Sequence, residues 1–214
     1  MPVFYTHEFN GRDAILNEEE SRHLIRVLRL KENDQVELVN GRGTLYKGTV
    51  SLADPRGSKI RVLETFEEHL ARNYHLHLAI APTKSAERFE WFLEKATEIG
   101  IEEITPILCE RSERNIIRHD PSVKILVAAV KQSGRAYLPQ LNPIIPLPEL
   151  LESARADIKY IAHCRSRTGI TPELPATGKP SWLILIGPEG DFTEAEVKLA
   201  KSMKVREINL GEAV

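Results

Sequence analysis

The sequence predicts an α/β domain with a mostly parallel sheet, preceded by a small β-barrel that carries one helix. Three observations lead to this fold class. The spacing of apolar residues changes near residue 70, short strand-like runs dominate before that point, and strands alternate with helices from His75 onward. With 214 residues and 42% hydrophobic content, the chain can form one large domain or two small ones. We expect two domains, 1–72 and 73–214, joined through the polar linker 67–73.

The first domain is expected to contain a short helix followed by strands. Asn17 and Glu20 have the spacing of a helix N-terminus, and the helix is expected to end near Arg29. Strand-like runs follow at 35–39, 44–50 and 59–63. Asn40-Gly41 separates the first two runs and supplies the positive φ angles of a type I′ turn, so it predicts a hairpin.

The second domain is expected to alternate strands with helices. Strands are predicted at 76–81, 104–109, 160–163, 182–186 and 207–210. Helices are predicted at 87–99 and 122–133, each ended by a glycine, and a further helix after residue 193. This alternation is typical of a mostly parallel sheet.

The segment from Trp182 to Thr193 is the most informative stretch of the chain. A short apolar run reads as a buried strand and leads into Gly187-Pro-Glu-Gly190, with Pro188 suited to the second position of a type I turn and Gly190 to the fourth. Thr193 and Glu196 then have the spacing of a capping box, so a helix should begin there. A strand, tight turn and helix form the ligand crevice at the carboxyl edge of many α/β sheets, although an ordinary connection would show the same residues.

Composition limits the classes of function. The formal net charge of −2 gives no overall attraction to nucleic acid, so RNA binding would depend on local basic patches. Cys109 and Cys164 lie far apart, which argues against a disulfide framework or a structural zinc site and favours a reducing compartment. The chain starts with polar residues, and its longest apolar runs are too short to span a bilayer. We expect a cytoplasmic protein.

Several common catalytic motifs are absent from the sequence. There is no Gly-x-Gly-x-x-Gly, no Gly-x-x-x-x-Gly-Lys-Ser/Thr and no Gly-x-Ser-x-Gly, so dinucleotide, nucleoside-triphosphate and serine-hydrolase functions are disfavoured. His75-x-His77 would place two imidazoles on one face of a strand, but no further ligand stands at the spacing of a metal site. We expect no metal.

Arginines form two clusters. Arg22, Arg26 and Arg29 are spaced to share one face of the first predicted helix, which suits either phosphate binding or a solvated surface. A second cluster follows the strand that ends at Cys109, at the edge where ligands bind in α/β sheets, and consists of Arg111, Arg114 and Arg118.

Three further polar residues stand near predicted element ends. Gln132 and Arg135 end a helix, where an arginine can simply interact with the helix dipole. His163 closes a strand at the ligand edge and could be a core histidine as easily as part of a pocket wall.

Several separate motifs in one order resemble the RsmE family of small-subunit rRNA (uracil-N3) methyltransferases, of the trefoil-knotted SPOUT class. They run collinearly along the chain and comprise His23-Leu-Ile-Arg-Val-Leu-Arg-Leu30, Lys95-Ala-Thr-Glu-Ile-Gly100, Pro106, Glu110-Arg-Ser112, Gln132-Ser-Gly-Arg135, Pro139, Leu185-Ile-Gly-Pro-Glu-Gly190 and Asn209-Leu-Gly211.

The resemblance implies a PUA-like RNA-binding barrel followed by a trefoil-knot domain that binds S-adenosylmethionine, working as a homodimer on 16S rRNA of the small ribosomal subunit. By position the resemblance places these residues at the cofactor: His163, Leu185, Ile186, Gly187, Pro188, Glu189, Gly190, Leu210 and Gly211. RNA contacts are expected from the two arginine clusters, at Arg22, Arg26, Arg29 and Arg114.

Two departures from the family pattern matter. The family usually reads Gly-Pro-Glu-Gly-Gly-Phe, and Asp191 replaces the last glycine of that run, which is tolerable if its φ is negative. The family also continues past its Leu-Gly pair into a helix that threads the knot, whereas this chain stops at Val214. We therefore expect one cofactor loop and the knot closure to be missing, and residues 1–214 to form a weak enzyme at best.

Methylation at N3 of uridine sets the chemistry that the implied site must perform. N3 lies on the Watson–Crick edge, so the base must be unpaired or drawn out of its stack. The N3 proton leaves and negative charge spreads to the carbonyl oxygens, which favours a positioned arginine over a covalent nucleophile. Arg111 and Arg135 are the catalytic candidates, with Gln132 reading the base edge.

Two rival functions stay open from the sequence. One is a knotted methyltransferase that acts on another RNA, such as tRNA. The other is a PUA-like RNA-binding protein whose cofactor domain is inactive.

Overall fold

A computed structural model describes residues 1–169 and 178–211. The chain forms two compact units, Met1–Ala71 with Leu126–Leu138, and Arg72–Ile125 with Pro139–Val214. The first unit thus includes residues 126–138 from the middle of the chain. Our expectation about the end of the chain concerns residues from 212 onward, which lie outside the described part.

The first unit contains a curled six-stranded sheet in the order β1-β4-β5-β6-β3-β2. All neighbouring strands are antiparallel except β1 and β4. Its interior is filled by fully buried side chains such as Phe4, Leu38 and Ile60. The three predicted runs are confirmed as β4, β5 and β6, while three earlier strands of three residues each are too short to show a period. The strands are β1 (Val3–Tyr5), β2 (Glu8–Asn10), β3 (Asp13–Ile15), β4 (Gln35–Val39), β5 (Leu45–Leu52) and β6 (Lys59–Phe66).

The β4–β5 hairpin is confirmed, but its turn type is not. Five residues connect the strands, and the left-handed positions are Gly41 and Gly43 rather than Asn40 and Gly41. The side-chain oxygen of Asn40 accepts hydrogen bonds from the backbone N–H groups of Arg42 and Thr44, at 2.8 and 3.1 Å. The asparagine therefore organises a longer loop through its side chain, as turn asparagines commonly do.

The first helix starts as predicted and then changes type. Asn17 caps α1 (Glu18–Arg22) by accepting the N–H of Glu20, and the chain continues as one π-helical stretch, η1 (His23–Val27). Arg29 lies beyond it with a φ of 56°. The i, i+4, i+7 face predicted for the three arginines is therefore wrong, because i→i+5 hydrogen bonding changes the rotation per residue.

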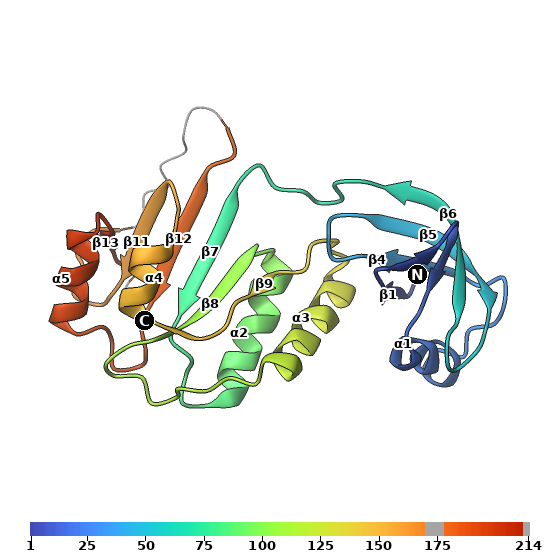
Figure 1. Ribbon diagram of the computed structural model, residues 1–214, viewed down its shortest axis with the longest axis horizontal. Coiled ribbons are helices and arrows are strands. Elements are labelled where there is room, and N and C mark those ends of the chain that lie inside the picture. Colours follow the sequence, from blue (N-terminus) through green and yellow to red (C-terminus); the bar gives the residue numbers. More distant parts are fainter. Residues whose placement is uncertain (170–177, 212–214) are drawn as a thin grey trace. The chain divides into compact units, whose positions relative to one another are not determined.

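The second unit contains a parallel sheet in the order β10-β8-β7-β12-β11-β13, with β9 also pairing β8 (Figure 1). The mostly parallel sheet is confirmed. Its strands are β7 (His75–Ile80), β8 (Glu103–Leu108), β9 (Gln140–Leu141), β10 (Ile145–Pro146), β11 (Ile158–Ala162), β12 (Ser181–Ile186) and β13 (Arg206–Ile208).

The helices that come after β7 in the chain begin and end at local sequence signals. Gly100 ends α2 (Ala86–Ile99) in the left-handed conformation, and Thr193 and Glu196 form the predicted capping box of α5 (Glu194–Ser202). The helix predicted from Ser122 begins earlier, as α3 (His119–Ser133), and α4 (Leu147–Ser153) was not predicted. Side chains of α4 and α5 pack with β7, β8, β11 and β12 in one buried cluster that includes Leu150, Leu185 and Phe192. Within the described residues, no helix is long and apolar enough to cross a membrane.

A polar network lies in the second sheet at the predicted histidine pair. The buried His77 ring is 2.7 Å from the Thr105 hydroxyl, and Glu103 on the neighbouring strand lies 3.7 Å from the rings of both His75 and His77. Asn142 donates to both Glu103 and Thr105 at 2.7 Å. The described residues contain no group of three side chains arranged to hold a metal ion.

The free energy of unfolding should fall on acidification because of His77. Burial, opposed by Glu103, lowers the pKa of His77 below its ordinary value. As the pH falls below about 6.5, the unfolded chain gains a proton that folded His77 does not, so stability decreases by up to about 1.4 kcal/mol per pH unit until the folded pKa is reached. Urea unfolding measured from pH 7.5 to 5 should show a smaller decrease in the free energy of unfolding for His77→Gln than for the unaltered protein. An equal dependence of the free energy of unfolding on pH in both proteins would contradict this prediction.

Candidate functional site

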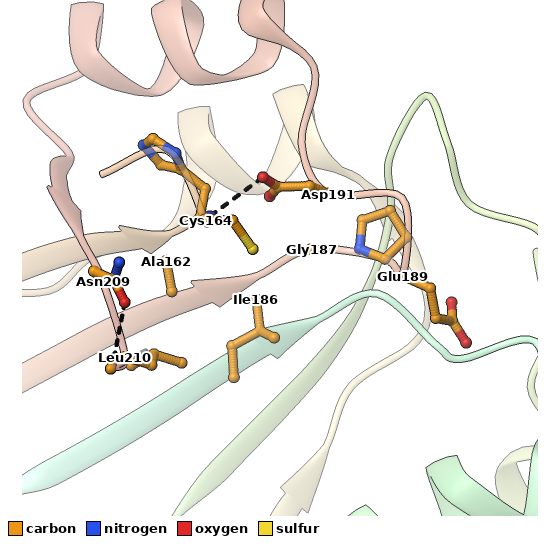
Figure 2. A pocket seen from close by; sticks show the side chains of 11 residues that line it. Ala162, Cys164, Ile186, Gly187, Glu189, Asp191, Asn209 and Leu210 are labelled. Carbon is orange, nitrogen blue, oxygen red and sulfur yellow. Dashed lines mark hydrogen bonds between the residues drawn. The ribbon is translucent and has the colours of Figure 1, made fainter. Parts of the chain in front are cut away.

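A cavity of about 670 Å³ opens at the carboxyl ends of β11, β12 and β13. Its walls are the segments that follow these three neighbouring strands. In Figure 2 the side chains of Ala162, Ile186 and Leu210 point toward a common space, which Cys164 and Asp191 border. The volume lies in the range of small-molecule sites, and the mixture of apolar walls and a few polar groups is usual for them. The edge is the one at which α/β sheets bind ligands.

The turn after β12 forms one wall of the cavity. The N–H of Asp191 donates to the carbonyl of Pro188 at 2.9 Å, which makes Pro188 the first residue of the turn, so the turn begins one residue later than predicted. A Cβ added to Gly187 would lie 3.0 Å from the ring of Phe192, which is fully buried. A side chain at 187 would therefore require the ring or the turn to shift by a few tenths of an ångström.

Asp191 adopts a left-handed conformation, with a φ of 60°. Our condition that φ be negative at this position is wrong. Aspartate tolerates this region better than most residues because its short side chain bonds locally, and here one carboxylate oxygen accepts the N–H of Phe192 at 2.8 Å. The other oxygen accepts the N–H of Cys164 at 3.3 Å, which joins the segment after β11 to the segment after β12.

His163 follows β11 and lies buried at the cavity wall. Its Nε2 is 3.1 Å from a carboxylate oxygen of Glu207, whose other oxygen pairs with Lys201 at 2.5 Å. The Lys201 ammonium, and after it the His163 ring, hold the pKa of Glu207 below its usual range. The Nδ1 atom of His163 is buried and has no hydrogen-bond partner among the described residues. A buried polar atom without a partner is unusual in a folded protein.

The family models match both parts of the chain. An RNA methyltransferase domain matches residues 71–214, and an RNA methyltransferase PUA domain matches residues 16–63. The chain belongs to the RNA methyltransferases. A relative from Mesomycoplasma hyopneumoniae, named ribosomal RNA small subunit methyltransferase E, is 30% identical over 75% of this chain and 71% of its own length. A relative of the same name from Aquifex aeolicus is 25% identical over 98% of this chain and 91% of its own. Membership in the methyltransferase E family follows.

Solved structures agree with this assignment. A structure described as a probable rRNA-methyltransferase from Porphyromonas gingivalis has a TM-score of 0.89 and 32% identity, covering 100% of this chain and 91% of that one. A ribosomal RNA small subunit methyltransferase E from Neisseria gonorrhoeae, bound to S-adenosyl methionine, has a TM-score of 0.88 and 25% identity, covering 100% and 90%. The predicted fold class of a PUA-like barrel followed by a parallel-sheet methyltransferase domain is thereby confirmed.

The cavity of this methyltransferase contains seven of the nine residues assigned to the cofactor from the sequence. Leu185 is fully buried in the hydrophobic core instead, and Gly190 packs beside the side chain of Arg111. Sequence reasoning did not assign the other residues of the lining to the cofactor, although each stands one place from an assigned residue. They are Ala162, Cys164, Asp191 and Asn209.

Hydrogen bonds tie three loops of the methyltransferase together at this edge. Arg111 donates to the carbonyl of Gly190 at 2.6 Å, and Arg114 donates to the carbonyls of Thr83 and Lys84 at 3.0 and 2.7 Å. The Glu189 carboxylate accepts the N–H of Lys84 at 3.0 Å, and in Figure 2 its side chain points away from the cavity. Glu189 and Arg114 thus hold the loop after β7 against the loops after β12 and β8.

The remaining predicted site residues of the methyltransferase lie in the first unit. Gln132 is exposed near the end of α3, and Arg135 follows it half-buried. Arg26 and Arg29 are exposed, whereas Arg22 forms an ion pair with Glu18. The cavity lining includes none of these five side chains.

Proposed function

We propose that this protein transfers a methyl group from S-adenosylmethionine to N3 of a uridine in 16S rRNA of the small ribosomal subunit. The observation that carries the proposal is the cavity at the ends of β11, β12 and β13, inside the region matched by the RNA methyltransferase model. The names of the relatives support rRNA of the small subunit as substrate. The S-adenosyl methionine in the Neisseria gonorrhoeae structure supports the cofactor.

The residues of the cavity fit this cofactor. Ala162, Ile186 and Leu210 offer apolar contacts to its adenine, while the Asp191 carboxylate offers polar ones. When bound, S-adenosylmethionine supplies an electrophilic methyl group on a sulfonium centre. The protein has to hold that group in line with the nucleophile and keep water away.

Arg111 is the proposed catalytic residue in the second unit. Its guanidinium donates to the carbonyl of Gly190 in the turn after β12. The side chain is exposed, so it can also contact a bound base. As the N3 proton leaves, this charge would stabilise the negative charge on the uracil carbonyl oxygens. Gln132 and Arg135 are proposed to contact the base edge.

We further propose that the protein acts as a cytoplasmic homodimer. The free cysteines Cys109 and Cys164 suit a reducing compartment. Trp91, Ile99 and Ile116 of the second unit are 63%, 59% and 71% exposed, and a second copy would bury such apolar surface. Mass measurement in solution tests the dimer.

RNA contacts by Arg26, Arg29, Arg22 and Arg114 should appear in the salt dependence of binding. Each phosphate contact that is lost should weaken binding and reduce the slope of log K against log salt by about 0.7 to 0.9. Single alanine variants are required because the arginines do not share a regular helix face. Arg56→Ala removes an exposed arginine of the first unit that we do not assign to RNA, and it should change neither quantity. An unchanged slope of log K against log salt in every variant would show that these arginines do not contact RNA and only form a solvated surface.

The function is tested by methyl transfer to purified substrates. Small ribosomal subunits, free 16S rRNA and tRNA are incubated with the protein and labelled S-adenosylmethionine, and the product nucleoside is identified by mass spectrometry. We expect N3-methyluridine in 16S rRNA. Transfer to tRNA alone would indicate a different substrate. RNA binding without cofactor binding would indicate an RNA-binding protein with an inactive cofactor domain.

A further inference from the structure

The cavity wall carries a fixed negative charge at Asp191. Its two carboxylate oxygens accept the N–H groups of Phe192 and Cys164 at 2.8 and 3.3 Å, so the side chain is held from two separate segments. The backbone of Asp191 is left-handed, with a φ of 60°. The carboxylate is half-buried and lines the cavity (Figure 2).

No positive side chain among the described residues of the lining offsets this charge. The other carboxylate of the lining belongs to Glu189, which is turned outward to Lys84. Two arginines outside the lining bond the backbone carbonyls on either side of Asp191: Arg111 donates to Gly190, and Arg165 donates to Phe192 and pairs with Glu194. Among the described residues of the lining, Asp191 therefore supplies the carboxylate that is held at the cavity wall.

We propose that Asp191 determines the preference of the cavity for the charged cofactor over the neutral product. This inference rests on the proposed function. S-Adenosylmethionine has one positive charge more than S-adenosylhomocysteine, because methyl transfer converts the sulfonium into a neutral thioether. The Asp191 carboxylate attracts S-adenosylmethionine more strongly than S-adenosylhomocysteine. Transfer of the methyl group therefore weakens binding of the ligand and favours release of S-adenosylhomocysteine.

Calorimetric binding of the two ligands tests this proposal without any RNA. Asp191→Asn tolerates the same backbone conformation and keeps one hydrogen-bond acceptor while removing the charge. It should weaken S-adenosylmethionine binding roughly tenfold, the effect of unit charges about 10 Å apart at an effective dielectric constant of about 20. Binding of S-adenosylhomocysteine should weaken by less than about threefold. If the substitution only disturbed the position of the bound ligand, binding of both ligands would weaken equally. The ratio of the two affinities is therefore the decisive quantity.

Two further variants control the test. Asp191→Gly suits the left-handed backbone and removes the whole side chain, so it should lower the affinity ratio even if the asparagine variant folds poorly. Glu194→Gln removes a nearby carboxylate that is 76% exposed and outside the cavity, and it should leave the ratio unchanged. An unchanged ratio in both Asp191 variants, with normal binding by the unaltered protein, would overturn this inference alone. Absence of S-adenosylmethionine binding by the unaltered protein would overturn the proposed function as well.

Discussion

Replacing Gly187 by valine is expected to abolish measurable cofactor binding and to lower the free energy of unfolding by about 2 kcal/mol or more. The added Cβ would lie 3.0 Å from two ring carbons of Phe192 and 3.3 Å from its backbone nitrogen. Phe192 is fully buried in the core formed with α4 and α5, so the ring cannot move aside without disturbing that core. The turn must shift instead, and the turn is a wall of the cavity.

Urea unfolding and calorimetric titration with S-adenosylmethionine measure the two effects. Gly57→Val is the matched control, because a Cβ at Gly57 meets nothing within 4 Å and its φ lies outside the left-handed region. That variant should keep both stability and affinity. Normal cofactor affinity in Gly187→Val would show that this turn does not form the cofactor site.

Arg111→Ala should reduce the rate of methyl transfer at saturating substrates by roughly 100-fold, the usual effect of removing one group that stabilises developing negative charge. Its loss also removes a hydrogen bond to Gly190, so cofactor affinity should fall slightly. The pH profile separates the two roles. At higher pH the base loses its N3 proton more readily, so the deficit of the variant should shrink if Arg111 stabilises the base anion.

Arg155→Ala provides the control for a general effect of removing positive charge. Arg155 is an exposed arginine of the same unit that donates to carbonyls at the end of α4. Its replacement should leave the rate within about twofold. A deficit in Arg111→Ala that stays constant with pH would restrict Arg111 to positioning the cofactor turn.

Local sequence signals predicted the elements whose ends are set by their own residues. The capping box at Thr193 and Glu196 and the left-handed end at Gly100 depend on neighbours within one helical turn, so both were predictable. The short strands β9 and β10 form because β8 offers them hydrogen bonds, and two residues cannot show a period. The π-helical stretch after Arg22 has no known marker in a single sequence.

Residues of the candidate site also differ in whether their role could be predicted from local sequence. Gly187 and its turn stood out because glycine and proline mark sharp backbone changes. The role of Asp191 could not be predicted, because its carboxylate is held by Cys164, which lies 27 residues away in sequence. Arg114 and Glu189 also bond to backbone atoms of the loop after β7, 30 or more residues distant, and no signal in the local sequence indicated this second role.

The position of β12 in the sheet affects how the protein is made. β12 lies between β7 and β11, and Ser181 pairs with His75, so about 100 residues must be synthesised after β7 before its partner exists. At a translation rate of roughly 5–20 residues per second, one edge of β7 stays unpaired for about 5–20 seconds on the ribosome. An open apolar edge is a site of aggregation. Nascent chains that stop before Ser181 should therefore depend on chaperones, whereas the first barrel, whose strands all lie within 66 residues, can form its sheet early.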